Sequence, residues 1–366
     1  MNKILLIGNS GLTKHGEDGQ TIKVRLYLRM IKSEGFDIVF VDLENFVKNP
    51  LSILLSIKKN IKICDRIVLI TASRGCKILI PLINRWNKNK KKPFVLPLIG
   101  ISVLHNSLRN LSIIQKQSFL VDKNYSLVKP DNRTSEQLKK TTYILPETEL
   151  LVDIFRDYYK LDNVYKLNNF RDIQVIQKNN RIFYEIRLVF LSRVMEIKGI
   201  FDLLEVVKDL TGKGCRITLD VYGKKIMTEV EEEKFNSYID DSSIKYKGTL
   251  DNNGVLKTLS NYDLLVFPTR YMGEGTPGVI SESLIAGTPV LTSEFAQARF
   301  LLRNGIDSIF YKMLDKEDLK SKLLYIINNK DILKDLREGA IESGKQFTYE
   351  HERKSFLKYV CGVEEE

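Results

Sequence analysis

Short runs of β-branched and other apolar residues alternate with longer stretches of helical periodicity along this 366-residue chain. In the first half the apolar runs occupy residues 3–7, 37–41, 66–71, 94–101 and 143–145, and in the second half 188–191, 216–222, 244–246, 264–267, 290–292 and 308–311. Helical patterns lie between them, for example at 21–33, 78–87, 199–210 and 278–286. This alternation is typical of parallel sheets whose strands are joined by crossover helices.

The alternation pauses once, in a polar stretch at residues 171–180, and then begins again. At about 150 residues per domain, the length also favours two domains. We therefore expect an α/β protein with two doubly wound, Rossmann-like domains in tandem and a ligand cleft between them. The expected domains are residues 1–171 and 172–345, followed by a C-terminal helix within 346–366 that packs toward the first domain.

The excess positive charge of the chain is confined to its first half. Residues 1–171 contain 29 Lys and Arg against 15 Asp and Glu, whereas residues 172–366 contain 28 against 31. Within residues 51–120 there are 13 basic residues and one acidic residue, and Trp86 lies in the basic run at 85–92. Basic side chains beside an aromatic anchor suit an anionic lipid surface. We expect residues 51–120 to contact an anionic membrane; the alternative is a merely solvated helix end.

No recognised nucleic-acid motif accompanies this charge, so no nucleic-acid partner is expected. The four cysteines are widely spaced, which favours a reducing compartment over a disulfide framework or a zinc site. No run of about 20 apolar residues is present, and the first apolar run is too short for a signal peptide. These features predict a cytoplasmic protein, peripheral on the inner face of the membrane.

The most specific segment of the sequence runs from Phe267 to Val290. A predicted strand ends at Phe267, a glycine-rich loop follows, and Glu274 and Glu282 lie eight positions apart around a helix start near Gly278. Backbone N–H groups at a helix start form an anion site that suits phosphate. Carboxylates accept hydrogen bonds from the hydroxyls of a sugar or a ribose. The alternative is a simple strand–loop–helix turn with two exposed glutamates.

The form E-x7-E, within Glu274-Gly-Thr-Pro-Gly278 and followed by Ala-Gly-Thr-Pro-Val, resembles the donor-site signature of family-4 glycosyltransferases of the GT-B fold. It is similar to the signature of bacterial capsule and O-antigen glycosyltransferases. Residues 189–199 resemble the family's G-R-L-x-x-x-K-G segment, with Ser192 where the family usually has glycine. The resemblance implies that Arg193 and Lys198 hold the donor diphosphate, that Glu274 holds sugar hydroxyls and that Glu282 holds the ribose. By the same resemblance the donor site includes Gly275, Thr276, Gly278 and Gly223.

Two features of the first half fit the same resemblance. The loop after the first predicted strand contains four glycines, which suggests close approach to a phosphate, and the next helix is expected to begin at residues 19–21. The resemblance implies that Gly19 and Gln20 face the donor. His105 follows the predicted strand at 94–101, where the family often has a histidine that contacts the transferred sugar. The alternative for His105 is a structural role.

We therefore predict a retaining GT-B hexosyltransferase that moves a sugar from a UDP-linked donor to a lipid-linked saccharide in surface polysaccharide biosynthesis. Its catalytic residues would be Glu274, Arg193, Lys198 and His105. No D-x-D triplet occurs in the sequence, so we expect no metal and no cofactor, with Arg193 and Lys198 compensating the diphosphate charge. The alternatives are a sugar-nucleotide epimerase or hydrolase on the same fold and a non-catalytic basic binding protein.

Overall fold

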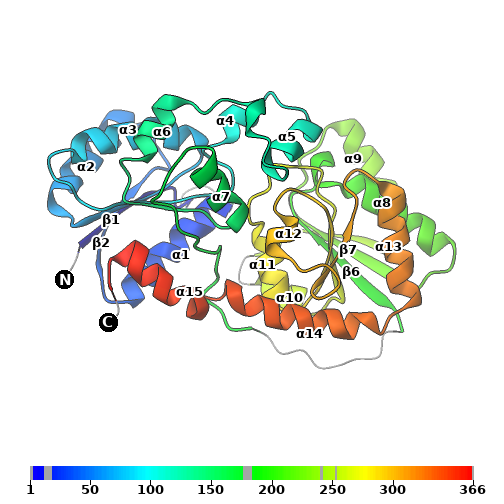
Figure 1. The fold of residues 1–366 in the computed structure, drawn as a ribbon. Helices are drawn as coiled ribbons and strands as arrows, with labels where there is room; N and C mark the ends of the chain where they lie inside the picture. The colour runs from blue at the N-terminus through cyan, green and yellow to red at the C-terminus, as the bar shows by residue number, and fades with distance from the viewer. Residues whose placement is uncertain (1–2, 12–18, 176–183, 240–241, 252–253, 365–366) are drawn as a thin grey trace. The chain divides into compact units, whose positions relative to one another are not determined.

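The computed structural model describes residues 3–11, 19–175, 184–239, 242–251 and 254–364 (Figure 1). The chain divides into two compact units, which are Met1–Asp172 with Glu350–Glu366, and Ile173–Tyr349. The sequence-based boundaries, 171/172 and 345/346, lie close to these divisions. No helix in the described ranges is both long enough and apolar enough to cross a bilayer.

The first unit is built on a five-stranded parallel sheet in the order β2-β1-β3-β4-β5. Its strands are β1 (Lys3–Gly8), β2 (Asp37–Asp42), β3 (Arg66–Ile70), β4 (Phe94–Pro97) and β5 (Tyr143–Leu145). Its helices include α1 (Gly19–Ser33), α2 (Pro50–Ile63), α3 (Ser73–Asn87), α4 (His105–Leu108), α5 (Ile113–Leu120), α6 (Asn132–Leu138) and α7 (Glu149–Asp157). The apolar residues at positions 4–7 of β1 are fully buried. Such a strand is covered on both faces, as the unbroken apolar run predicts.

The strand expected at residues 94–101 is shorter in the structure. β4 ends at Pro97, which has no N–H to donate to a neighbouring strand. Gly100 then adopts a φ of +48°, which turns the chain away from the sheet. His105 therefore does not directly follow a strand but begins the short helix α4. The expectation of a strand over residues 94–101 is therefore wrong in its length, whereas His105 still lies on the connection that follows the carboxyl end of β4.

The end of the chain completes the first unit. Helix α15 (Tyr349–Phe356) continues as a π-helical turn at Leu357–Cys361. The ring of Phe356 packs edge-on against Tyr27 and Phe170, with centroids 5.1 and 5.6 Å away. Arg353 forms two hydrogen bonds of 2.7 Å to the two carboxylate oxygens of Glu34. Aromatic packing and a bidentate ion pair thus join this helix to α1.

The second unit contains a six-stranded parallel sheet in the order β11-β10-β9-β6-β7-β8. Its strands are β6 (Ile186–Leu191), β7 (Ile217–Tyr222), β8 (Ile244–Gly248), β9 (Leu264–Phe267), β10 (Val290–Ser293) and β11 (Ser308–Tyr311). Its helices include α8 (Ile200–Gly212), α9 (Glu229–Asn236), α10 (Val255–Leu259), α11 (Gly278–Ile285), α12 (Ala298–Leu301), α13 (Lys316–Asn328) and α14 (Ile332–Gly344). The strand order is that of a dinucleotide-binding sheet. From β6 the next strands are added on one side of the sheet, as β7 and β8, and from β9 they are added on the other side, so the order reverses between β6 and β9.

Both faces of this second sheet are buried. Leu188 and Phe190 of β6 belong to the core that contains side chains of α8 and α13. Val189, between them, belongs to a separate core with side chains of α10 and α11. Because alternate residues of one strand enter two cores, the sheet has no open face. The carboxyl ends of the strands are therefore the part of this unit that positions a ligand site.

Gly199 allows the loop after β6 and the loop after β9 to come together. It has a φ of +73°, and it separates a 3-10 turn at Glu196–Lys198 from α8. A Cβ atom at this position would lie 1.9 Å from the carbonyl oxygen of Pro268. Only glycine therefore fits both the backbone conformation and the close approach.

We expect Gly199→Ala to lower the free energy of unfolding of the second unit by more than about 2 kcal/mol, because a left-handed backbone alone costs an L residue about 1–2 kcal/mol. The clash with Pro268 adds to that cost. Gly214→Ala is the matched control, since Gly214 has a φ of +84° but no atom of the described residues beyond its chain neighbours lies within 4 Å of its Cβ position. Urea denaturation followed by circular dichroism compares the two variants. Equal losses of unfolding free energy in the two variants would contradict the close approach of Gly199 to the carbonyl oxygen of Pro268.

Candidate active site

The residues that the sequence singles out in the second unit lie on two neighbouring loops. Arg193 and Lys198 are on the connection from β6 to α8, and Glu274 is on the connection from β9 to α11. β6 and β9 are paired neighbours in the sheet. The carboxyl edge at such a reversal of strand order is where doubly wound sheets bind their ligands. The topology thus brings together residues that are far apart in the sequence.

A buried ion pair joins the two loops. The Lys198 ammonium donates a hydrogen bond to Oε1 of Glu274, and the two side chains are only 8% and 11% exposed. The hydroxyl of Thr269 donates to the same carboxylate oxygen over 2.9 Å. The ammonium also lies 5.8 Å from the ring centroids of both Phe267 and Tyr271, at cation–π distance. A desolvated lysine is therefore balanced by one carboxylate and two aromatic faces.

Two groups at this edge remain available to a ligand. The exposed Arg193 has no hydrogen bond or ion pair from its guanidinium within the part of the chain that the structure describes. Among the same residues, Oε2 of Glu274 accepts no hydrogen bond. Burial and the charge of Glu274 raise the pKa of the Tyr271 hydroxyl, whereas the charge of Arg193 lowers it. The edge therefore offers a guanidinium that suits phosphate and a carboxylate oxygen that suits a hydroxyl.

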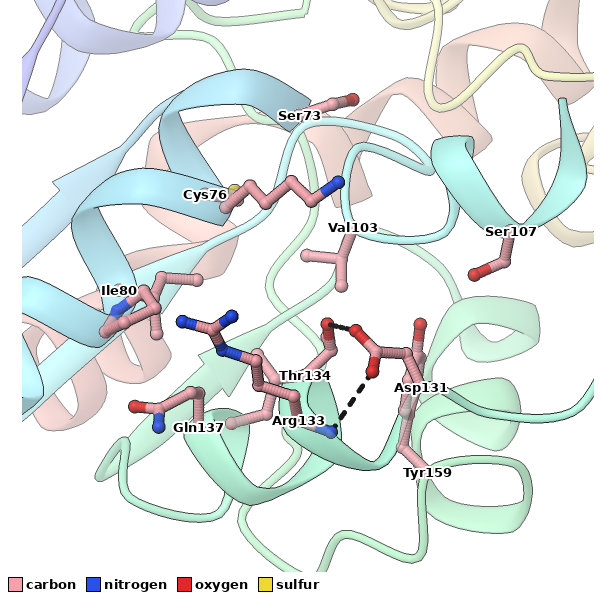
Figure 2. A pocket seen from close by; sticks show the side chains of 13 residues that line it. Ser73, Cys76, Ile80, Val103, Ser107, Asp131, Arg133, Thr134, Gln137 and Tyr159 are labelled. Carbon is pink, nitrogen blue, oxygen red and sulfur yellow. Dashed lines mark hydrogen bonds between the residues drawn. The ribbon is translucent and has the colours of Figure 1, made fainter.

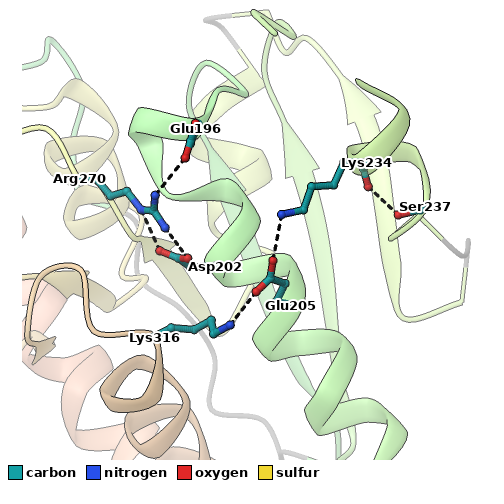
Figure 3. Close-up of polar contacts among 7 residues, drawn as sticks. All are labelled: Glu196, Asp202, Glu205, Lys234, Ser237, Arg270 and Lys316. Carbon is teal, nitrogen blue, oxygen red and sulfur yellow. Dashed lines mark hydrogen bonds and ion pairs between the residues drawn. The ribbon is translucent and has the colours of Figure 1, made fainter. Parts of the chain in front are cut away.

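Arg270 braces these two loops, and sequence reasoning missed it. Its guanidinium forms a fork on Asp202 of α8, with distances of 2.9 and 2.5 Å, and a third bond of 3.3 Å to Glu196 (Figure 3). Its backbone N–H donates to the carbonyl oxygen of Ile197 over 2.9 Å. The hydrogen bonds to Asp202 raise the pKa of Arg270 above its usual value. No local spacing could have signalled this role, because Asp202 is 68 residues away in the sequence.

The helix that carries Asp202 is held in turn by a second group of charges. Glu205, on the same helix, accepts hydrogen bonds from Lys234 at 3.1 Å and Lys316 at 2.7 Å (Figure 3). The hydrogen bond from Lys316 lowers the pKa of Glu205. These contacts connect α8 to α9 and to the start of α13. They hold α8 in place, and α8 carries Asp202, the residue to which Arg270 bonds.

The other residues assigned by resemblance in the second unit surround these loops. Gly275 and Thr276 lie just before α11, Gly278 is its first residue, and the half-buried Glu282 lies one turn further. Gly223 follows β7 with a φ of +136°, and a Cβ there would lie 1.7 Å from the carbonyl oxygen of Ser192. Gly223 therefore lets the loop after β7 pack against the residue that precedes Arg193.

The residues assigned in the first unit lie on two helix starts. Gly19 and Gln20 form the first turn of α1, after residues 12–18, which lie outside the described ranges. His105 begins α4, and its side chain is likewise outside what the structure describes. Within the described residues, no group of three or more His, Cys, Asp and Glu side chains is arranged to hold a metal ion.

We expect Lys198→Met to lower the free energy of unfolding of the second unit by about 3 kcal/mol or more, because it leaves the Glu274 carboxylate buried without its partner. The double variant Lys198→Met, Glu274→Gln leaves no unpaired buried charge and should recover part of that loss. Urea denaturation of wild type, both single variants and the double variant gives the coupling energy. Strictly additive losses would show that the two side chains do not interact.

Comparison with known proteins agrees with this fold. Residues 185–329 match the family model described as "Glycosyl transferases group 1". An uncharacterized glycosyltransferase of Methanocaldococcus jannaschii is 26% identical over 175 residues, which are 48% of this chain and 46% of the relative. The match therefore spans about half the length of that curated relative.

Two solved structures share the fold over nearly their whole length. HepE of Anabaena, in complex with UDP, has a TM-score of 0.72 at 12% identity and covers 99% of this chain and 100% of its own. Sucrose-phosphate synthase of Thermosynechococcus elongatus has a TM-score of 0.73 at 12% identity, with coverage of 99% and 98%. The expectation of two doubly wound domains of the GT-B type is thereby confirmed. Residues 185–329, within the second unit, are thus similar to group 1 glycosyltransferases, and the chain has the GT-B fold.

Proposed function

We propose that the protein transfers a sugar from a UDP-linked donor to a saccharide acceptor, with retention of configuration at the anomeric carbon. The observation that carries the proposal is the convergence of Arg193, Lys198 and Glu274 at the point where the strand order reverses, in a unit that matches the group 1 model. The presence of UDP in the structure of HepE supports a uridine nucleotide.

Positive charge for the donor diphosphate comes from Arg193 and Lys198. In the free protein the Lys198 charge is balanced by Glu274. A bound diphosphate introduces competing negative charge, so Lys198 moves toward phosphate and Glu274 becomes available to sugar hydroxyls. Two cations at this edge stabilise the departing diphosphate, and we therefore propose that the reaction needs no metal.

In the proposed reaction the bond between the anomeric carbon and the β-phosphate oxygen breaks while the acceptor oxygen bonds to the same face of the sugar. The acceptor hydroxyl gives its proton to the departing phosphate oxygen. No side chain is then required as a base. Arg193 stabilises the charge that develops on the leaving diphosphate.

We expect Arg193→Gln to weaken UDP binding at least tenfold, because a charge-assisted hydrogen bond is worth about 1.5–3 kcal/mol. Glu274→Gln should bind UDP at least as tightly as wild type, since it releases Lys198, but should transfer sugar more than tenfold more slowly. Calorimetry with UDP and a transfer assay in excess EDTA measure both effects.

Arg216→Gln is the matched control for these variants, since Arg216 is exposed and precedes β7 at the opposite edge of the sheet. Equal UDP affinities of the Arg193 and Arg216 variants would contradict the diphosphate assignment. Loss of transfer in EDTA, restored by Mg²⁺ or Mn²⁺, would contradict metal independence. Release of free sugar without an acceptor would favour a hydrolase or epimerase, and absence of any nucleotide binding would favour a basic binding protein.

We further propose that the acceptor is lipid-linked, belongs to a surface polysaccharide, and is met at the cytoplasmic face of the membrane. Four free cysteines are consistent with a reducing compartment. The basic run at residues 85–92 is, however, not a fully available surface. Trp86 is half-buried, and the Lys92 ammonium donates to the carbonyl oxygens of Lys62 and Cys64, so that it caps the end of α2.

The outer face of α2 suits a membrane better. Val47, in the turn before α2, is 91% exposed, and Leu51 and Leu55 of α2 are 76% and 66% exposed. The exposed Lys58, Lys59 and Lys62 follow along the helix. Exposed apolar residues beside lysines favour binding at an anionic lipid interface. Because α2 begins after the carboxyl end of β2, its apolar half lies toward the ligand-binding edge of the sheet. The run at 85–92 begins in the last turn of α3, at the opposite edge.

We expect the triple variant Lys58→Ser, Lys59→Ser, Lys62→Ser to bind anionic vesicles on the order of 100-fold more weakly, since each basic residue near such a surface contributes about 1 kcal/mol. Leu51→Ser with Leu55→Ser should also weaken binding, whereas Ile114→Ser, which changes an equally exposed residue of α5, should not. Co-sedimentation with phosphatidylglycerol vesicles at low and high salt tests this. Equal binding to neutral vesicles would contradict the proposed surface.

A further inference from the structure

A cavity of about 280 Å³ lies in the first unit between α3 and α6 (Figure 2). Its volume is near the lower end of the range for small-molecule sites. Ser73, Lys77 and Pro81 line it from α3, and Arg133 and Gln137 line it from α6.

The two walls are joined to each other. The side-chain amide of Asn84 on α3 donates to the carbonyl oxygen of Gln137 at 2.8 Å and to its side-chain oxygen at 3.0 Å. The cavity is therefore a preformed feature and does not depend on a ligand to hold the two helices together.

The cavity opens where a doubly wound sheet places its ligands. Ser73 begins α3, directly after the short loop that follows β3. Val103 and Ser107, which also line the cavity, belong to the connection that follows β4. These segments lie at the carboxyl edge of the sheet, the edge at which open α/β sheets bind ligands. The cavity therefore lies on the side of the sheet where a binding site is expected.

The free charge in the cavity is positive. The Lys77 ammonium and the Arg133 guanidinium have no hydrogen-bond or ion-pair partner within the described ranges. Asp131, the single carboxylate of the lining, is already engaged, because it accepts hydrogen bonds from the hydroxyl of Thr134 at 2.6 Å and from the backbone N–H of Arg133 at 3.1 Å. Those bonds, chiefly that from Thr134, and the nearby charge of Arg133 lower the pKa of Asp131, which is the N-cap of α6.

The rest of the lining is neutral. Burial raises the pKa of the Cys76 thiol to about 12, so it is protonated and is not a nucleophile at neutral pH. Ile80, Pro81 and Val103 add apolar surface, and Ser73 adds a hydroxyl. Figure 2 shows Arg133 extending from α6 toward α3, across the space that the apolar residues enclose.

We propose that this cavity binds an anionic sugar, whose carboxylate or phosphate is contacted by Arg133 and whose ring lies against the apolar wall, while Lys77 adds a second positive charge to the lining. Pyranose rings have apolar C–H faces and polar edges, which matches a cavity with both kinds of lining. The inference rests on the proposed function in one respect: such a sugar is the part of the acceptor that the first unit recognises.

The test uses the full-length protein and three probes: D-glucuronic acid, glucose 6-phosphate and neutral glucose. Calorimetry or ligand-observed NMR should show that at least one acidic sugar binds tenfold or more tightly than glucose, because the cavity supplies two unpaired cations. Comparing glucuronic acid with glucose 6-phosphate identifies whether a carboxylate or a phosphate is recognised. Arg133→Gln and Lys77→Gln should each weaken binding of that sugar at least fivefold.

Arg74→Gln is the matched control, because Arg74 is an exposed residue of the same helix that does not line the cavity. Equal binding of glucose and both acidic sugars, or equal losses in the Arg74 and Arg133 variants, would overturn the proposal. UDP affinity is measured on the same samples. Acidic-sugar binding without UDP binding would contradict the proposed function alone, and UDP binding without a preference for acidic sugars would contradict the cavity assignment alone.

Discussion

The ion pair between Lys198 and Glu274 is the interaction on which the candidate site depends. Both charges are largely removed from water, so each is costly unless the other is held in place. They come from different loops, and the pairing therefore requires those loops to keep a fixed separation. That requirement explains why the residues around the ion pair are themselves held by close contacts and hydrogen bonds.

Three kinds of contact keep the loops at that separation. Gly199 has no side chain where the carbonyl of Pro268 approaches, so the two backbones can come together. Arg270 then bonds to Asp202 through two nitrogens, which fixes direction as well as distance. Thr269 orients the carboxylate of Glu274 from the same loop. The two loops are therefore in place before any ligand arrives, so that only side chains have to move when a diphosphate binds.

The sequence predicts the strands well because buried parallel strands are short apolar runs that polar loops interrupt. It also brings Arg193, Lys198 and Glu274 into one candidate site, since their loops follow strands that meet at one edge. It does not predict that Lys198 bonds to Glu274, because a motif specifies residue types and not the partners they choose without a ligand. The fork between Arg270 and Asp202 has no local signal either, since packing of α8 against the sheet creates it. The strand predicted at 94–101 is too long, because the apolar pattern does not register the effects of Pro97 and Gly100 on the backbone.

The basic residues of the first unit do not form a single surface. Some of them bond to groups within the fold, and others have no such bond in the described ranges. Lys23 is buried and bonds to Glu147 at 2.6 Å and to the carbonyl of Leu98 at 2.7 Å, so it joins the chain segments that follow β4 and β5. Lys92 caps α2. Charges of this kind are satisfied within the fold and cannot attract a partner. The cations that have no partner among the described residues, such as Arg133 in the cavity and the exposed lysines of α2, are the ones that a partner can use. A net charge therefore indicates an anionic partner only after the internally paired residues are set aside.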